Sequence, residues 1–267
     1  MGSGKFRITL KGDEADDSLR LSDLIDQLNA VKSALSQVDI AISGSRTPDL
    51  YYRITNITMN SPATFEFEAA SKARSSSHGR RVVSRFNRDL RTVIGGKRPK
   101  DASLDLLESY AALAQPMKKH IDQVSLQFED HRLELPRNLD MKVDDILGPD
   151  QIEQGSIIGS LDVIDVHNQR NLFKVYPVVG PRIIKCRFPQ GMLTDALNAI
   201  QRFVKIHGEL HYKKSEKFPH LVKVSKIEIL PDRSDKSSLS SLRGIAAGAL
   251  RGKSSTEYVD MVRNGDW

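Results

Sequence analysis

Residue types that could perform catalysis are present in this chain, but their spacing forms no recognisable catalytic pattern. The seven histidines are scattered, and none belongs to an HExxH motif or to another metal-ligand spacing. Cys186, the only cysteine, lies in the alternating stretch IIKCRF, where we expect it to face a core. Neither a GxSxG nucleophile motif nor a kinase signature occurs. We therefore expect a protein without enzymatic activity, metal ion or cofactor.

Arginine is the residue type whose spacing is most informative. Residues 71–100 contain ten lysines and arginines against one acid, Asp89. Residues 79–94 are predicted to form a helix that ends at Gly95-Gly96, with its apolar residues on one side. A stripe on the other side consists of Arg81, Arg85, Arg88 and Arg91. Such a stripe either binds successive phosphates of a nucleic acid or is an ordinary solvated helix face.

The elements that must position this helix follow from periodicity and turn residues. In chain order we expect a strand at 5–10, a helix at 22–39, a hairpin around Asn60-Ser61-Pro62, the basic helix, a helix at about 101–119 and a short strand pair, QVSLQFED and HRLEL. We assign residues 1–150 to one domain of mixed helices and β-hairpins, so the predicted fold class is α+β.

After Gly148-Pro149-Asp150 the pattern changes to short strands. Residues 153–231 are predicted to form three strands, a helix and two further strands, and Gly208 in a strand interior is expected to permit a sharp bend. This order resembles the five-stranded OB-fold barrel, whose second and third strands commonly bind single-stranded nucleic acid. The resemblance implies an outward binding face formed by Lys174, Tyr176, Lys185 and Arg187.

The tail, residues 232–267, begins as a polar linker and is predicted to end in a short helix. Ser254 and Glu257 fit a capping box, so the helix should run from Ser255 to about Arg263. A helix this short is marginal alone in water. The tail therefore packs either on its own body or on another polypeptide. The side chains suited to such a contact are Leu242, Arg243, Ile245, Leu250, Arg251, Tyr258, Val259, Val262, Arg263 and Trp267.

The arrangement LRG…ALRG…SSTEYVDMVRNGDW resembles the C-terminal tails of VapB-type antitoxins from bacterial toxin–antitoxin pairs. The resemblance implies a tail that wraps a PIN-domain ribonuclease and inserts an arginine into its acidic active site. A guanidinium pairs well with clustered carboxylates, and Arg243, Arg251 and Arg263 are the candidates. The remainder of the chain departs from the family, because the DNA-binding domain of a usual antitoxin is much smaller.

The sequence therefore favours an antitoxin-like interaction protein that neutralises a protein partner, and the alternative is a nucleic-acid-binding protein. The formal net charge of +6 suits an anionic partner because the charge is clustered. No apolar run approaches the roughly 20 residues that span a bilayer, and a single cysteine favours a reducing compartment. We expect a cytoplasmic protein without a membrane partner. The oligomeric state, a homo-oligomer included, does not follow from the sequence.

Overall fold

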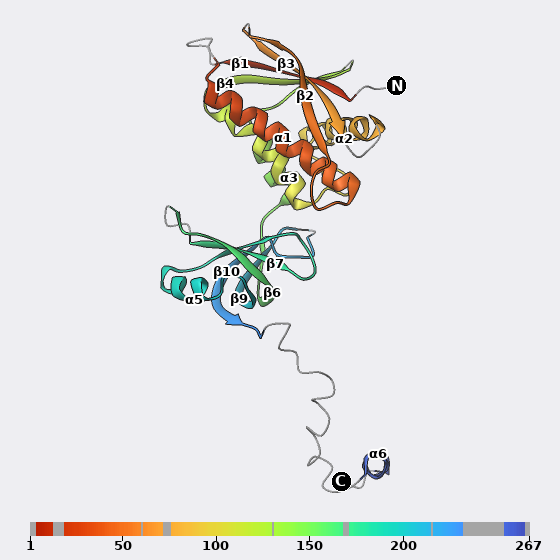
Figure 1. Ribbon diagram of the computed structural model, residues 1–267, viewed down its shortest axis with the longest axis vertical. Coiled ribbons are helices and arrows are strands. Elements are labelled where there is room, and N and C mark those ends of the chain that lie inside the picture. Colours follow the sequence, from red (N-terminus) through yellow and green to blue (C-terminus); the bar gives the residue numbers. More distant parts are fainter. Residues whose placement is uncertain are drawn as a thin grey trace. The chain divides into compact units, whose positions relative to one another are not determined.

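The computed structural model describes residues 4–12, 19–59, 61–71, 76–129, 131–167, 171–214, 216–231 and 254–264. The chain divides into two compact units, Met1–Asp150 with Lys213–Glu216 and Gln151–Tyr212 with Lys217–Trp267. Each unit combines helices with a five-stranded sheet, so the protein is of the α+β class (Figure 1). None of the helices in the described ranges is both long and apolar enough to cross a membrane.

The first unit is built on an antiparallel sheet with the strand order β2-β3-β1-β4-β5. Its strands are β1 (Lys5–Gly12), β2 (Leu50–Thr58), β3 (Ala63–Ser71), β4 (Ile121–Phe128) and β5 (His131–Glu134). Along β1, Phe6, Ile8 and Leu10 are buried, whereas the residues between them are more exposed. Helices lie on one side of this sheet (Figure 1). The opposite, open face carries ion pairs such as Arg7–Glu66.

Four α-helices belong to the described part of this unit: α1 (Leu21–Ser43), α2 (Ser76–Ile94), α3 (Leu104–Ala111) and α4 (Leu139–Leu147). The predicted strand at 5–10, the helices near 22–39 and 79–94, the hairpin and the short strand pair are confirmed. The predicted helix at 101–119 is wrong in length. α3 ends at Ala111 and two 3-10 turns follow, because Pro116 has no N–H for the helical hydrogen bonds.

The second unit contains a sheet that closes on itself. Its elements are β6 (Gln151–Asp165), β7 (Leu172–Pro177), β8 (Ile184–Arg187), α5 (Leu193–Asn198), β9 (Arg202–Tyr212) and β10 (Leu221–Ile229). The strands follow the order β10-β8-β7-β6-β9, and β10 also pairs with β9. All of these pairs are antiparallel except β8 with β10. The predicted succession of three strands, a helix and two strands is confirmed.

The interior of the closed sheet is apolar, and β8 has the predicted alternation. Ile184 and Cys186 are buried, whereas Lys185 and Arg187 are exposed. Burial raises the pKa of the Cys186 thiol, so this group remains protonated, as expected of a core residue rather than a nucleophile. Gly208 is placed where β9 and β10 approach closely. A Cβ atom there would lie 2.0 Å from the carbonyl oxygen of Lys223, so no side chain fits.

Candidate nucleic-acid interface

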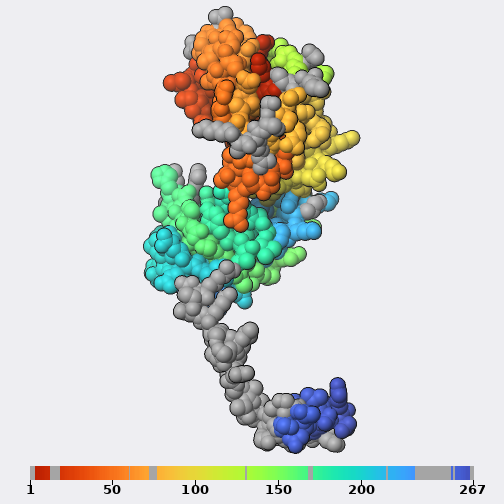
Figure 2. Space-filling model, turned by 45° about the vertical axis from the view of Figure 1, so that its right-hand side comes forward, coloured from red at the N-terminus to blue at the C-terminus, as the bar shows by residue number. Residues whose placement is uncertain are grey.

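A groove of about 710 Å³ in the first unit, the α2 groove, collects basic side chains from several elements. Arg80, Arg81, Arg85 and Arg88 come from α2, Lys5 from β1 and His131 from β5. Glu129 is the one acid among the described lining residues, and apolar contacts come from Ile42, Val83 and Phe128. The outer side of α2, gold in Figure 2, lies at the molecular surface. The groove thus presents guanidinium groups to solvent on a concave surface.

The amphipathic sequence of α2 explains why its arginines face this groove. Val82, Phe86 and Leu90 are buried in the core of the unit, as the predicted apolar side of the helix requires. The opposite side retains the arginines. Arg81 is exposed, and the side chain of Arg88 is 75% exposed. This helix therefore presents part of the predicted stripe to solvent.

Two of the four predicted stripe arginines differ from the expectation. Arg91 does not line the groove; its Nε donates to Asn87 Oδ1 at 3.2 Å. Arg85 does line the groove, but its side chain is committed to the protein. Its Nε donates to Asp89 Oδ2 at 3.2 Å, and its Nη2 donates to the carbonyl oxygen of Asp101 at 3.4 Å. The stripe is therefore not four equivalent phosphate ligands.

Asp89 explains the role of Arg85. This carboxylate is 3% exposed and also accepts a hydrogen bond from the hydroxyl of buried Tyr110, at 3.2 Å. Burial, and then the charge of Asp89, raise the pKa of Tyr110, so its hydroxyl remains a donor. Because a buried carboxylate is costly without a partner, the guanidinium of Arg85 primarily stabilises the fold.

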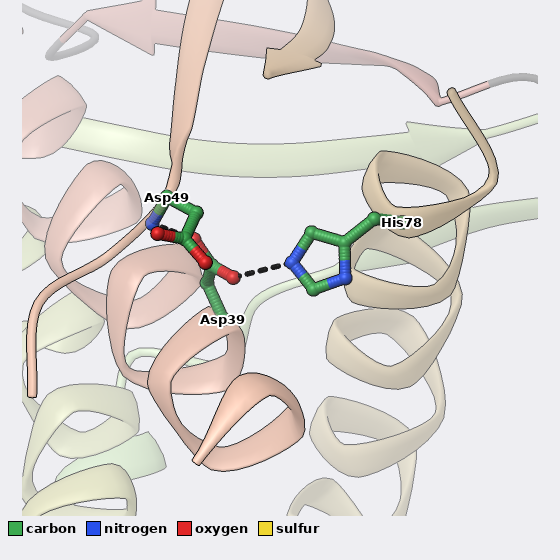
Figure 3. A group of neighbouring side chains, drawn as sticks. All are labelled: Asp39, Asp49 and His78. Atoms are coloured by element: carbon green, nitrogen blue, oxygen red, sulfur yellow. Dashed lines mark hydrogen bonds and ion pairs between the residues drawn. The ribbon is translucent and has the colours of Figure 1, made fainter. Parts of the chain in front are cut away.

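The first turn of α2 is fixed by a buried carboxylate of α1. Asp39 Oδ1 lies 2.6 Å from His78 Nε2, and Asp39 Oδ2 accepts the N–H group of Asp49 at 2.7 Å (Figure 3). Asp39 Oδ2 also accepts the N–H group of Leu50 at 2.8 Å. Asp39 and His78 are 0% and 1% exposed. His78 Nδ1 lies 3.4 Å from the Nη2 donor of Arg81. With a proton on Nε2, the ring donates to Asp39, and Nδ1 can accept from Arg81.

The same three side chains are the nearest approach to a metal site in the described residues. The ligand atoms of Asp39, Asp49 and His78 lie within 4.8 Å of one another, although no sequence motif links them. Both oxygens of Asp39, however, already accept hydrogen bonds from protein groups. We therefore interpret the group as a hydrogen-bonded junction between α1, β2 and α2, which holds the basic helix in place.

The predicted face of the second unit has the expected orientation. Lys174 and Tyr176 on β7, and Lys185 and Arg187 on β8, alternate with buried residues and point away from the core. Lys174 lies directly opposite Lys185, and Arg187 neighbours Lys223 on β10. This surface, the β7–β8 face, is thus a row of cations with one aromatic side chain.

The tail is described only at α6 (Ser255–Asn264). The capping box is confirmed: Ser254 N–H donates to Glu257 Oε2 at 2.7 Å, and Glu257 N–H donates to Ser254 Oγ at 3.3 Å. Val259 and Val262 are 46% and 38% exposed, Tyr258 is half-buried and Arg263 is exposed. The other predicted contact residues lie outside the described residues: Leu242, Arg243, Ile245, Leu250, Arg251 and Trp267.

Three groove residues were missed by the sequence reasoning. Arg80 precedes the predicted stripe and forms no ion pair within the described ranges; its position at the start of the helix is a signal that could have identified it. Lys5 and His131 come from strands whose ends meet only through the pairing of β1 with β4 and of β4 with β5.

Comparison with protein-family models, curated proteins and solved structures finds no match to this chain.

Proposed function

We propose that this protein binds nucleic acid through the α2 groove. The observation that carries the proposal is the convergence of arginine and lysine side chains from α2 and β1, with His131 of β5, on one concave surface that has a single acid among its described lining residues. A solvated helix face gives no reason for a lysine of a neighbouring strand to line the same concave surface. A phosphate, in contrast, accepts charge-assisted hydrogen bonds from several guanidinium groups, and a concave site directs them at the same ligand.

The spacing of the exposed arginines supports a polymeric ligand. Arg81 and Arg88 are seven residues apart, which corresponds to about 10 Å along a helix axis. That distance exceeds the size of one phosphate group. The arginines therefore suit a chain of phosphates better than one isolated phosphate.

The β7–β8 face supports the same function as a second, weaker contact. The parallel pairing of β8 with β10 and the place of α5 between β8 and β9 support an OB-fold-like barrel. In that fold the second and third strands bind single strands. Tyr176 is the one aromatic residue among the four predicted face residues, so we assign this face a smaller share of the affinity.

Salt-dependent binding tests the proposal. The variant Arg80→Ala/Arg81→Ala/Arg88→Ala should bind a labelled single-stranded oligonucleotide at least about 30-fold more weakly, with a log–log salt slope reduced by about 2. Fluorescence anisotropy at several salt concentrations measures both quantities. Arg91→Ala, which removes an arginine of the same helix outside the groove, is the control and should change affinity by less than about threefold. An unchanged slope in the triple variant would overturn the proposal.

A second candidate function is neutralisation of a protein partner by the tail, as the resemblance to VapB-type antitoxins implies. The capped helix α6, with exposed Val259 and Val262 beside Arg263, is the observation that favours it. The expected partner is a PIN-type ribonuclease encoded by a neighbouring reading frame. A pull-down with that ribonuclease should succeed for the full chain and fail for a chain that ends at Pro231. Equal capture by the shortened chain would contradict this function.

A further inference from the structure

A second hollow, of about 230 Å³, lies beside the α2 groove in the first unit. Its lining includes Arg7, Thr55, Glu66 and Gln127, which come from β1, β2, β3 and β4. Arg7 and Glu66 form an ion pair on the open face of the sheet, at 2.6 Å. We call this site the sheet hollow. Its chemistry differs from that of the groove, because its main charges offset each other.

The groove and the sheet hollow share two lining residues, Lys5 and Glu129. Lys5 is the first residue of β1, and Glu129 follows the last residue of β4. These strands are antiparallel, with Arg7 opposite Gln127, so Lys5 and Glu129 lie at the same end of the sheet. At this end the helix-covered face passes into the open face. The two depressions therefore meet at the ends of β1 and β4.

We infer that the groove and the sheet hollow form one continuous binding track for single-stranded nucleic acid. Phosphates of the strand lie in the groove against Arg80, Arg81 and Arg88, and a base enters the sheet hollow. The inference rests on the proposed nucleic-acid function of the groove and adds the strandedness of the ligand and a site for base contacts.

The course of the track excludes a duplex. A ligand that occupies both depressions must turn around the ends of β1 and β4, from the helix-covered face of the sheet to the open face. A single strand rotates about several bonds in each nucleotide and can make this turn. Double-stranded DNA has a persistence length of about 150 base pairs and cannot bend so sharply over a few residues.

The polar groups of the sheet hollow suit a base edge better than a phosphate. The Nε2 of Gln127 donates to the carbonyl oxygen of Glu129 at 3.2 Å, and the amide also carries Oε1 as an acceptor. Thr55 is exposed and adds a hydroxyl group. Carboxamide and hydroxyl groups read the donors and acceptors of base edges, whereas phosphates are bound mainly by cations. Glu66 and Glu129 further disfavour a phosphate in this hollow.

The variant Thr55→Val/Gln127→Ala separates base contacts from phosphate contacts. We would measure its binding to a mixed-sequence single strand of DNA, the same strand of RNA, the corresponding DNA duplex and inorganic polyphosphate. Single-strand binding should weaken about tenfold, whereas polyphosphate binding should stay within about twofold of the unsubstituted chain. Gln123→Ala is the matched control, because Gln123 lies on the same strand, donates to Glu134 and does not line the hollow. It should leave binding of every probe unchanged.

The outcomes distinguish this inference from the function on which it rests. If the double variant loses polyphosphate and oligonucleotide binding equally, or loses neither, the inference of a continuous binding track is wrong. Tighter binding of the duplex than of its single strand also overturns it. In each of these cases, nucleic-acid binding by the α2 groove remains supported as long as the triple arginine variant loses binding. If the unsubstituted chain binds none of the four probes, the proposed function itself fails.

Discussion

The α2 groove and the β7–β8 face are both cationic, but their charges are supported in different ways. Behind the groove, buried Asp89 pairs with Arg85 at 3.2 Å and more distantly with the exposed Arg88 at 3.9 Å. On the β7–β8 face, Lys174 lies directly opposite Lys185, an arrangement that opposes folding. On the same closed sheet, Lys223 pairs with Glu209 at 3.2 Å. Cationic character alone therefore does not define a binding site; the acids behind and beside the cations determine how firmly they are held.

Gly208→Ala tests whether the α2 groove keeps its function when the unit that carries the β7–β8 face is destabilised. The added Cβ atom would lie 2.0 Å from the carbonyl oxygen of Lys223, so the second unit should lose at least about 3 kcal/mol of unfolding free energy. Urea unfolding followed by circular dichroism measures this loss. Polyphosphate binding, which we assign to the groove, should persist.

Gly191→Ala is the control for this substitution, because a Cβ atom at Gly191 has no neighbour within 4 Å. It should leave the stability of the second unit nearly unchanged. If Gly208→Ala lost polyphosphate binding as well as the stability of the second unit, the groove would depend on the closed sheet.

Arg85→Ala should sharpen the distinction between supporting and exposed cations. It removes the ion-pair partner of an almost completely buried carboxylate, so we expect a loss of about 2 kcal/mol in the unfolding free energy of the first unit. Arg88→Ala removes a side chain that is 75% exposed and should cost less than about 0.5 kcal/mol. Chemical unfolding compares the two variants. Adding Asp89→Asn should recover part of the loss in Arg85→Ala, and equal losses for both arginines would refute this assignment.

Lys174→Glu should stabilise the second unit. The substitution replaces two like charges in directly opposite positions with an opposite-charge pair, for a gain of about 0.5 kcal/mol at low salt. The gain should shrink as salt is added. Lys226→Glu, opposite His207 rather than another lysine, is the control. A destabilised Lys174→Glu variant would mean that the two lysines do not repel each other in the folded protein.

A comparably small predicted effect concerns a charge pair outside both surfaces. A hydrogen bond from Lys118 lowers the pKa of Asp140 below its ordinary value of 3.8. Because the pKa is lowered on folding, this stabilisation is present above pH 3.8 and is lost as the pH falls through the lowered value. Asp140→Asn should cost about 0.5 kcal/mol near neutral pH, and the difference should vanish in stronger acid. Urea unfolding across this range checks the trend, which a pH-independent difference would contradict.

Local sequence patterns predicted the elements well because their causes lie within a few residues. The apolar spacing of Val82, Phe86 and Leu90 determines the buried side of α2, and Ser254 with Glu257 determines the start of α6. α4 escaped prediction because it is only nine residues long. So short an element covers few helical turns, and its periodic signal is weak.

The details of the site could not be predicted because they depend on residues far apart in the chain. Arg85 reaches the carbonyl oxygen of Asp101, sixteen residues away, and His78 pairs with Asp39 across thirty-nine. Whether an arginine supports the fold or faces a ligand thus depends on tertiary packing. Helical spacing identified the basic helix, but it could not identify which of its arginines was already occupied.

The parallel pairing of β8 with β10 has a consequence for protein synthesis. These strands meet at Leu221, Val222 and Lys223, so the ring stays open until that part of the chain has left the ribosome. Before then, β8 and β9 each have an edge whose backbone groups can pair with another nascent chain. A chain truncated just before Leu221 should therefore aggregate through the second unit, because β8 and β9 keep their unpaired edges.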